Sequence, residues 1–146
     1  MLDLELDGKV AIVTGASRGL GRSSAVALLE QGVRVLAVAR SIDELRKLES
    51  ERPDAVRAVQ CDMQDAAAVA ALAQQALDAF GRLDIVVNNA GIAPAGKFVE
   101  QSPAVWQQVM AVNVTAPMLL AQAASRRSDF ATGAVYVIDG GESSRL

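Results

Sequence analysis

The feature that most constrains the fold is a glycine-rich turn between an apolar run and a helical pattern. Residues 10–13 are all apolar, which is typical of a strand buried in a parallel sheet. The turn Gly15-Ala16-Ser17-Arg18-Gly19-Leu20-Gly21 comes next, and residues 23–31 then carry apolar side chains at helical spacing before Gly32. Glycines allow a tight turn and a close approach to a pyrophosphate, and a helix N-terminus offers free N–H groups to an anion. The pattern therefore predicts a dinucleotide-binding unit of strand, turn and helix.

A second motif, Asn88-Asn89-Ala90-Gly91, follows the apolar residues 85–87. Together with the spacing Gly15-x-x-x-Gly19-x-Gly21, it resembles the classical short-chain dehydrogenase/reductase family. Residues 6–10 resemble the lead-in to the family's first strand, and residues 132–141 resemble its C-terminal strand and turn. The resemblance covers nearly the whole chain in two blocks, residues 1–124 and 125–146.

The resemblance implies a nicotinamide dinucleotide cofactor and suggests its contacts. We expect these contacts in four groups: Gly15, Ser17, Arg18, Gly19, Leu20 and Gly21 for the pyrophosphate, Arg40 for a 2′-phosphate, Asp62 and Met63 for the adenine, and Asn89, Ala90 and Gly91 for the ribose. Asn113 matches the helix asparagine of the family's catalytic tetrad, which anchors a proton-relay water.

The residue at the end of the second predicted strand decides which dinucleotide is expected. Sites for NAD usually carry an acidic residue there, which bonds the ribose 2′-hydroxyl. This chain has Arg40 instead, and its planar guanidinium can pair with a 2′-phosphate. Arg18 in the glycine turn is a second candidate for that phosphate. We expect NADP(H), with NAD(H) as the alternative.

The rest of the family's catalytic set does not match. The family's tyrosine and lysine are four residues apart, but the only tyrosine here, Tyr136, is followed four places on by Gly140. The last lysine is Lys97, well before that tyrosine. The family's segment with the catalytic serine, tyrosine and lysine would follow Ala124, and at roughly 30 residues per strand–helix–strand unit at least two units are missing. We therefore expect no hydride transfer by this chain alone.

Three explanations of the missing segment remain open. The gene can carry an internal deletion, the chain can be a naturally degenerate relative, or the sequence can be an incomplete form of an ordinary NADP-dependent carbonyl reductase or alcohol dehydrogenase. A different function is a non-catalytic oligomeric interaction protein. Losing a packing partner would bare apolar residues on the Asn113 helix and favour a homo-oligomer; those residues are Val109, Val112, Ala116, Leu119, Leu120 and Ala123.

Composition limits the other possibilities. The 146 residues are 51% hydrophobic and 21% charged, which fits one globular α/β domain over residues 1–146. A net charge of −3 without a basic stripe argues against nucleic acid as a partner. With no histidine and Cys61 as the only cysteine, we expect no metal site and no disulfide framework. An acidic N-terminus and the lack of a long apolar run predict a cytoplasmic protein without a membrane span.

The alternation of strands and helices predicts a Rossmann-like, doubly wound parallel sheet in three α/β/α layers. Expected strands are 9–14, 33–39, 56–61, 84–88 and 133–139, in the order 3-2-1-4-5, with the last strand beside the fourth. The alternative is that residues 133–139 pair with another chain. A capping box at Ser41 to Glu44, a cap at Asp65 and a helix from Ser102-Pro103 to about Ala124 with a kink at Pro117 complete the expected pattern.

Overall fold

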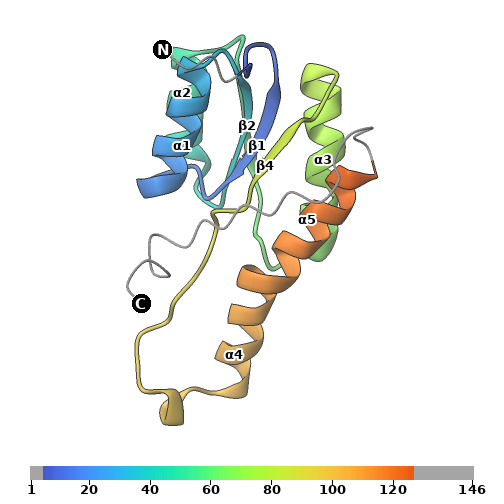
Figure 1. The fold of residues 1–146 in the computed structure, drawn as a ribbon. Coiled ribbons are helices and arrows are strands. Elements are labelled where there is room, and N and C mark those ends of the chain that lie inside the picture. The colour runs from blue at the N-terminus through green and yellow to red at the C-terminus, as the bar shows by residue number, and fades with distance from the viewer. Residues whose placement is uncertain (1–4, 127–146) are drawn as a thin grey trace.

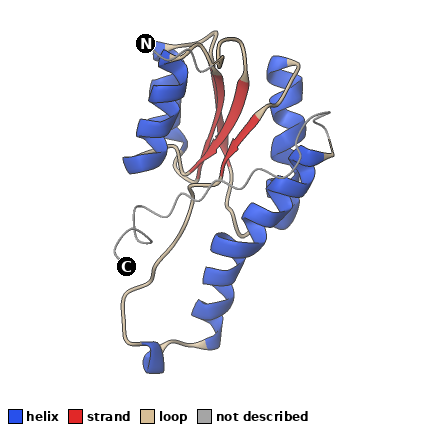
Figure 2. Cartoon of the chain, in the orientation of Figure 1, coloured by secondary structure: helices blue, strands red, loops and turns tan. Residues whose placement is uncertain are grey.

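The computed structural model describes residues 5–126, which form a parallel sheet with helices on both of its faces (Figures 1 and 2). The strands are β1 Val10–Thr14, β2 Arg34–Ala39, β3 Val56–Gln60 and β4 Ile85–Val87. The α-helices are α1 Gly19–Glu30, α2 Ile42–Glu51, α3 Ala66–Phe80, α4 Pro103–Met110 and α5 Ala116–Ser125. A 3-10 turn, η1 Phe98–Glu100, precedes α4, and a π-helical turn, η2 Ala111–Thr115, joins α4 to α5.

The strand order is β3-β2-β1-β4, and every pairing is parallel. Ile12 in the central strand β1 lies opposite Leu36 on one side and Val86 on the other. The α/β class and the first four positions of the expected order are confirmed. The expected fifth strand, residues 133–139, lies outside the described residues, as does Tyr136.

Alternating side chains along the strands make two separate cores. Val10 and Ile12 of β1 face α3 and α5, where they pack with residues such as Leu72. Ala11 and Val13 face the opposite way and pack with residues of α1 and α2. Because both faces of the sheet are covered, β1 and most of β2 are buried, and their sequences are apolar apart from Thr14 at the end of β1 and Arg34 at the start of β2.

Two of the three predicted N-caps, at Asp65 and Ser102, are confirmed. Asp65 accepts a hydrogen bond from the Ala68 N–H at 3.0 Å, and Gly81 closes α3 in the left-handed conformation with φ 80°. The hydroxyl of Ser102 accepts from the Val105 N–H at 3.3 Å at the start of α4.

The capping box at the start of α2 was predicted wrongly. Ser41 occupies the N-cap position, but its side chain makes no cap hydrogen bond. The carboxylate of Glu44 does not reach back to Ser41, because it binds Lys47 one turn later at 2.5 Å. Helix α1 also begins at Gly19, one turn earlier than expected, so the last glycines of the turn lie in its first turn.

The helix after Ser102 runs to Ser125 and changes geometry before its internal proline. Pro117 lacks an N–H and cannot donate to the carbonyl of Asn113, one turn earlier. The backbone widens into the π-helical turn Ala111–Thr115 directly before it. The expected distortion is therefore a π-helical turn that contains Asn113.

The exposed face of this helix is not the one we expected. Val112, Ala116, Leu120 and Ala123 are buried, because α5 packs against the apolar stripe of α3. The large apolar side chains that solvent reaches lie on another face of the helix: Trp106, Met110, Val114 and Met118. We call these four residues the outer seam.

The same helix bears on the expectation that the chain has no membrane span. Pro103–Ser125 is 23 residues long and contains an 18-residue window with a mean hydropathy of 1.2, so by length and composition alone it could cross a membrane. The test is weak evidence for a span, since core helices of soluble proteins also satisfy it, and α5 packs on α3.

Candidate dinucleotide site

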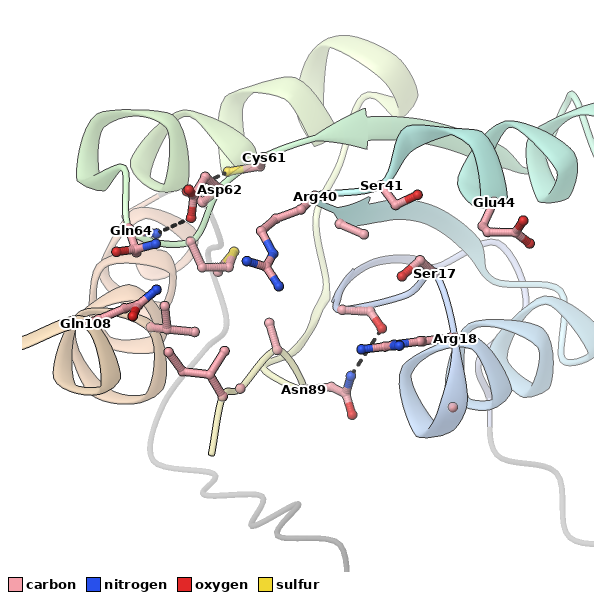
Figure 3. Close-up of a pocket in the computed structure, with 18 residues that line it drawn as sticks. Ser17, Arg18, Arg40, Ser41, Glu44, Cys61, Asp62, Gln64, Asn89 and Gln108 are labelled. Atoms are coloured by element: carbon pink, nitrogen blue, oxygen red, sulfur yellow. Dashed lines mark hydrogen bonds between the residues drawn. The ribbon is translucent and has the colours of Figure 1, made fainter. Parts of the chain in front are cut away.

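A cavity of about 510 Å³ opens at the carboxyl ends of the strands, the edge at which doubly wound sheets bind ligands. The glycine turn and the ends of β2, β3 and β4 surround it, and the α4–η2 helix closes one side (Figure 3). Its lining residues are Gly15, Ser17, Arg18, Gly19, Ala39, Arg40, Ser41, Glu44, Cys61, Asp62, Met63, Gln64, Asn89, Ala90, Gly91, Ile92, Gln108 and Val112.

Most of the residues expected to touch a cofactor line this one cavity. The glycine turn, Arg40, the Asp62-Met63 pair and the Asn89-Ala90-Gly91 segment all meet there, although they are far apart in sequence. Leu20, Gly21 and Asn113 do not line it. Leu20 is exposed, whereas Gly21 and Asn113 support lining residues from behind, as the following contacts show.

The glycine turn is packed too closely for side chains at two positions. Gly15 has φ 67°, and an added Cβ there would lie 2.8 Å from Asn89 Nδ2. At Gly21 a Cβ would overlap both the Gly15 carbonyl oxygen and the same Asn89 nitrogen. Gly21 thus lets α1 begin directly against the turn, which keeps the helix N-terminus at the cavity wall.

Hydrogen bonds join the carboxyl ends of β1 and β4 behind the cavity. The buried Thr14 hydroxyl donates to the Val87 carbonyl at 3.3 Å and accepts from the N–H groups of Asn89 and Ala90 at 3.1 and 3.0 Å. Asn89 Nδ2 donates to the Thr14 carbonyl at 3.0 Å and to the Gly15 carbonyl at 3.4 Å, the second of which is drawn in Figure 3. The Asn89 side chain therefore holds the glycine turn in place.

The two arginines of the cavity are electrostatically unpaired. Among residues 5–126, no hydrogen bond or ion pair engages the side chain of Arg18 or Arg40. Arg40 points into the cavity in Figure 3. The nearby acid, Glu44, is bound to Lys47, whose hydrogen bond and charge lower the Glu44 pKa. This end of the cavity thus has two guanidinium groups available to an anion.

At the end of β3, the cavity is lined by the Cys61 thiol and by the turn that begins at Asp62. Asp62 Oδ1 accepts from the Gln64 N–H at 2.9 Å, which shapes the turn after β3. The Cys61 thiol donates to the Asp62 carbonyl at 3.6 Å, and Met63 is buried beside it. Burial, with the charges of Asp65 and Asp62, raises the pKa of Cys61, so this thiol stays protonated and unreactive at neutral pH.

Asn113 does not line the cavity but binds the backbone of Ile92, which does. Its Nδ2 donates to the Ile92 carbonyl at 2.9 Å, and its Oδ1 accepts from the Ile92 N–H at 2.9 Å. Both functional atoms of the side chain are thus committed to the backbone of one lining residue. Asn113 therefore positions the segment after β4 against the π-helical turn.

Eight lining residues were not among the predicted cofactor contacts: Ala39, Ser41, Glu44, Cys61, Gln64, Ile92, Gln108 and Val112. Gln64 and Ile92 directly follow motifs that were recognised, so sequence proximity was a usable signal. Gln108 lies on α4, and it lines the cavity because this helix lies beside the carboxyl ends of the strands. No local pattern in the sequence could have shown this.

Among residues 5–126, no tyrosine–lysine pair of the kind that the family resemblance implies lines the cavity. No tyrosine occurs in residues 5–126, and neither Lys9, Lys47 nor Lys97 lines the cavity. Across these same residues, no cluster of three or more His, Cys, Asp or Glu side chains could hold a metal ion. The arrangement is suited to binding an anionic, extended ligand.

Comparison with known proteins agrees with this geometry. The family model for short chain dehydrogenases matches residues 9–138. D-threitol dehydrogenase of Mycolicibacterium smegmatis is 38% identical over 138 residues, an alignment that covers 92% of this chain and 53% of that protein. The chain spans about half the length of most of the curated relatives it matches.

Solved structures show the same fold. A metagenomic short-chain oxidoreductase in complex with NADP superposes with a TM-score of 0.76 and 41% identity, covering 82% of this chain and 56% of that one. A short chain dehydrogenase from Burkholderia cenocepacia J2315, also in complex with NADP, has a TM-score of 0.77 and 35% identity, covering 84% of this chain and 51% of that one.

Proposed function

Because the chain belongs to the short-chain dehydrogenase family, we propose that residues 1–146 form a single domain that binds NADP(H). The observation that carries this proposal is the pair of unpaired guanidinium groups, Arg18 and Arg40, at one end of the cavity. A 2′-phosphate would supply the negatively charged partner that both guanidinium groups lack. The neighbouring carboxylate of Glu44 is bound to Lys47, so its charge is partly neutralised.

The remaining lining groups fit the rest of a dinucleotide. The N-terminus of α1, with the glycine turn packed against it, offers backbone N–H groups to the pyrophosphate. Asp62 and Met63 flank the place proposed for the adenine, and Asn89, Ala90 and Gly91 lie where a ribose would meet the end of β4. Leu20 and Gly21 act from the first turn of α1, Gly21 by permitting its close approach.

When bound, NADPH would supply a hydride to a carbonyl and NADP⁺ would accept one from an alcohol, but proton transfer must come from the protein. A positioned acid or base contributes about 10²–10⁴-fold in rate. Of the family's tetrad only Asn113 is matched, and its side-chain atoms are bound to Ile92. We therefore propose that this chain binds the cofactor without hydride transfer, and that a longer form with the missing segment acts on a carbonyl or a secondary alcohol in the cytoplasm.

The test is a fluorescence titration of the chain with NADPH and, in parallel, NADH. We expect saturable binding that is tighter for NADPH, and a reversed preference in Arg40→Asp. Lys47→Met is a matched control, because it frees the Glu44 carboxylate without removing either arginine. It should weaken NADPH binding less than Arg40→Asp does. Equal affinity for the two dinucleotides, or an unchanged preference in Arg40→Asp, would refute the assignment of the 2′-phosphate site.

The outer seam supports a second candidate function, self-association in a non-catalytic role. Trp106, Met110, Val114 and Met118 follow one another at four-residue spacing, and each is more than one-third exposed. Contiguous exposed apolar surface of this kind marks interaction sites. Sedimentation over a range of concentrations tests it, and a monomer at every concentration would argue against a homo-oligomer through the Asn113 helix.

A further inference from the structure

Among residues 5–126, the sheet edge formed by β4 has no neighbouring strand. Within residues 5–126, β4 pairs with β1 alone, from Ala11↔Ile85 to Val13↔Val87. Its three residues are apolar and half-buried, with no charge, proline or bulge among them. Natural edge strands usually carry such features, because a bare edge recruits another strand. The other outer strand, β3, differs, since it carries the charged Arg57.

A polar atom beside this edge also lacks a partner. The Oδ1 of Asn88, which follows β4 directly, is buried and accepts no hydrogen bond from the described residues. Leaving a buried acceptor without a hydrogen-bond donor destabilises the folded state. Within residues 5–126, Asn88 Oδ1 and the backbone edge of β4 thus lie side by side without a donor.

The path of the chain points toward this edge. The α4–α5 helix follows β4, and α5 returns along the sheet to end at the side where β4 begins (Figure 1). Helix α5 packs on α3 and also contacts β4. A strand that follows such a helix enters the sheet parallel to the preceding strand, with a right-handed crossover in nearly all cases.

The sequence after α5 contains a segment suited to that position. Residues 133–139 read Gly-Ala-Val-Tyr-Val-Ile-Asp, a run with the β-branched and aromatic residues typical of buried parallel strands. Residues 127–132 separate it from the end of the helix, and helix-to-strand connections of about two to six residues are the most common.

We propose that the free edge of β4 is the docking site for residues 133–139 of the same chain, as a fifth parallel strand. The added backbone satisfies the edge of β4 and brings N–H groups within reach of Asn88 Oδ1. Because parallel strands end at the same edge of a sheet, Asp139-Gly140-Gly141 then lies on the side of the cavity formed by Gly91 and Ile92. The short tether favours this segment over a second copy, since it holds the segment at high effective concentration.

Hydrogen exchange on the unmodified chain is the first test. If residues 133–139 pair with β4, peptides covering residues 134–138 should exchange at least about tenfold more slowly than an unstructured peptide of the same sequence. Exchange at the rate of the unstructured peptide would overturn the proposal. The test does not depend on cofactor binding, so it is independent of the proposed function.

Cross-linking identifies the occupant. In a Cys61→Ala background, Val87→Cys is combined with Val135→Cys or with Val137→Cys, because neighbouring strands place Cα atoms within the 4.4–6.8 Å that disulfides span. The matched control replaces Val87→Cys with Ser23→Cys on α1. We expect an intrachain disulfide in one of the Val87 pairs and none in the control. A disulfide between chains would assign the edge to a second copy and overturn the proposal, as would the absence of any disulfide in both Val87 pairs.

Discussion

Apolar side chains are buried in the sheet beside the cavity, whereas on helix α4 they are exposed to solvent. Strand β1 is fully buried, and the cavity behind the glycine turn is fastened by hydrogen bonds from Thr14 and Asn89. Helix α4 has no buried residue, and apolar side chains at its solvent-facing positions include Trp106 at 56% exposure and Met110 at 37%. Just before it, Phe98 and Val99 are more than 80% exposed.

This difference separates two kinds of constraint. In the first region each residue is fixed by several neighbours, so a small change in volume or hydrogen bonding should be costly. In the second region the helix is held by its continuation into η2 and α5, so changes on its outer face should cost little in the isolated chain. Substitutions in the two regions can therefore test the contrast.

The largest effect is expected from Gly21→Ala. Its Cβ would overlap the Gly15 carbonyl oxygen, and backbone cannot move aside as a side-chain end can. We expect a loss of about 3 kcal/mol in the free energy of unfolding and no measurable NADPH binding. Chemical denaturation and the NADPH titration measure the two.

The control for Gly21→Ala is Gly81→Ala at the end of α3. Gly81 has φ 80°, but no atom lies within 4 Å of an added Cβ. It should cost about 1–2 kcal/mol from backbone conformation alone and leave NADPH affinity unchanged. Equal losses of stability and binding in the two variants would show that the close packing of the turn is not what distinguishes this region.

The next effect is expected from Asn113→Ala, at the boundary between the two regions. The substitution removes both hydrogen bonds to Ile92, and we expect a loss of about 1–2 kcal/mol in unfolding free energy with weaker NADPH binding. Asn113→Asp keeps an acceptor for the Ile92 N–H but loses the donor, so its effect should be intermediate. If Asn113→Ala left both quantities unchanged, the link from the π-helical turn to the cavity would have no energetic importance.

The sequence predicted features that depend on neighbouring residues better than features that depend on packing between distant elements. The first four expected strands, the glycine turn and the caps at Asp65 and Ser102 depend on local patterns, and the described residues contain them. The role of Glu44 was predicted wrongly because its carboxylate has two possible partners nearby in sequence, the Ser41 backbone and Lys47, and it binds Lys47. The buried face of α5 could not be predicted, because it depends on the position of α3 in space.

A smaller effect, dependent on pH, is expected from Asp84→Asn between the two core strands. Burial raises the pKa of Asp84, but hydrogen bonds from Arg82 and the Val10 N–H outweigh it, so the net pKa is below its ordinary value of 3.8. The ionised carboxylate therefore stabilises the folded state above that value, and this stability is lost as the pH falls through the lower, folded pKa.

Asp84→Asn should cost about 1 kcal/mol at pH 7, because the amide still accepts from Val10 but loses the charged pair with Arg82. Unfolding curves of both proteins at pH 7 and at decreasing pH give the difference. It should remain constant down to about pH 4 and close below it. A difference that stayed the same at pH 2 would mean that ionisation of Asp84 is not its source.

The smallest effect is expected from Trp106→Ser in the outer seam. Trp106 is the only tryptophan, so fluorescence reports on this one position. In dilute solution the substitution should change the unfolding free energy by less than about 0.5 kcal/mol, because the indole is already largely in water. The wild-type emission maximum should accordingly lie at the long wavelength of an exposed indole. A shift to shorter wavelength as concentration rises would show that association buries the seam, and Trp106→Ser should then weaken the association. A loss above 1 kcal/mol in dilute solution would instead place Trp106 in a packed environment, and the contrast between the two regions would fail at its clearest point.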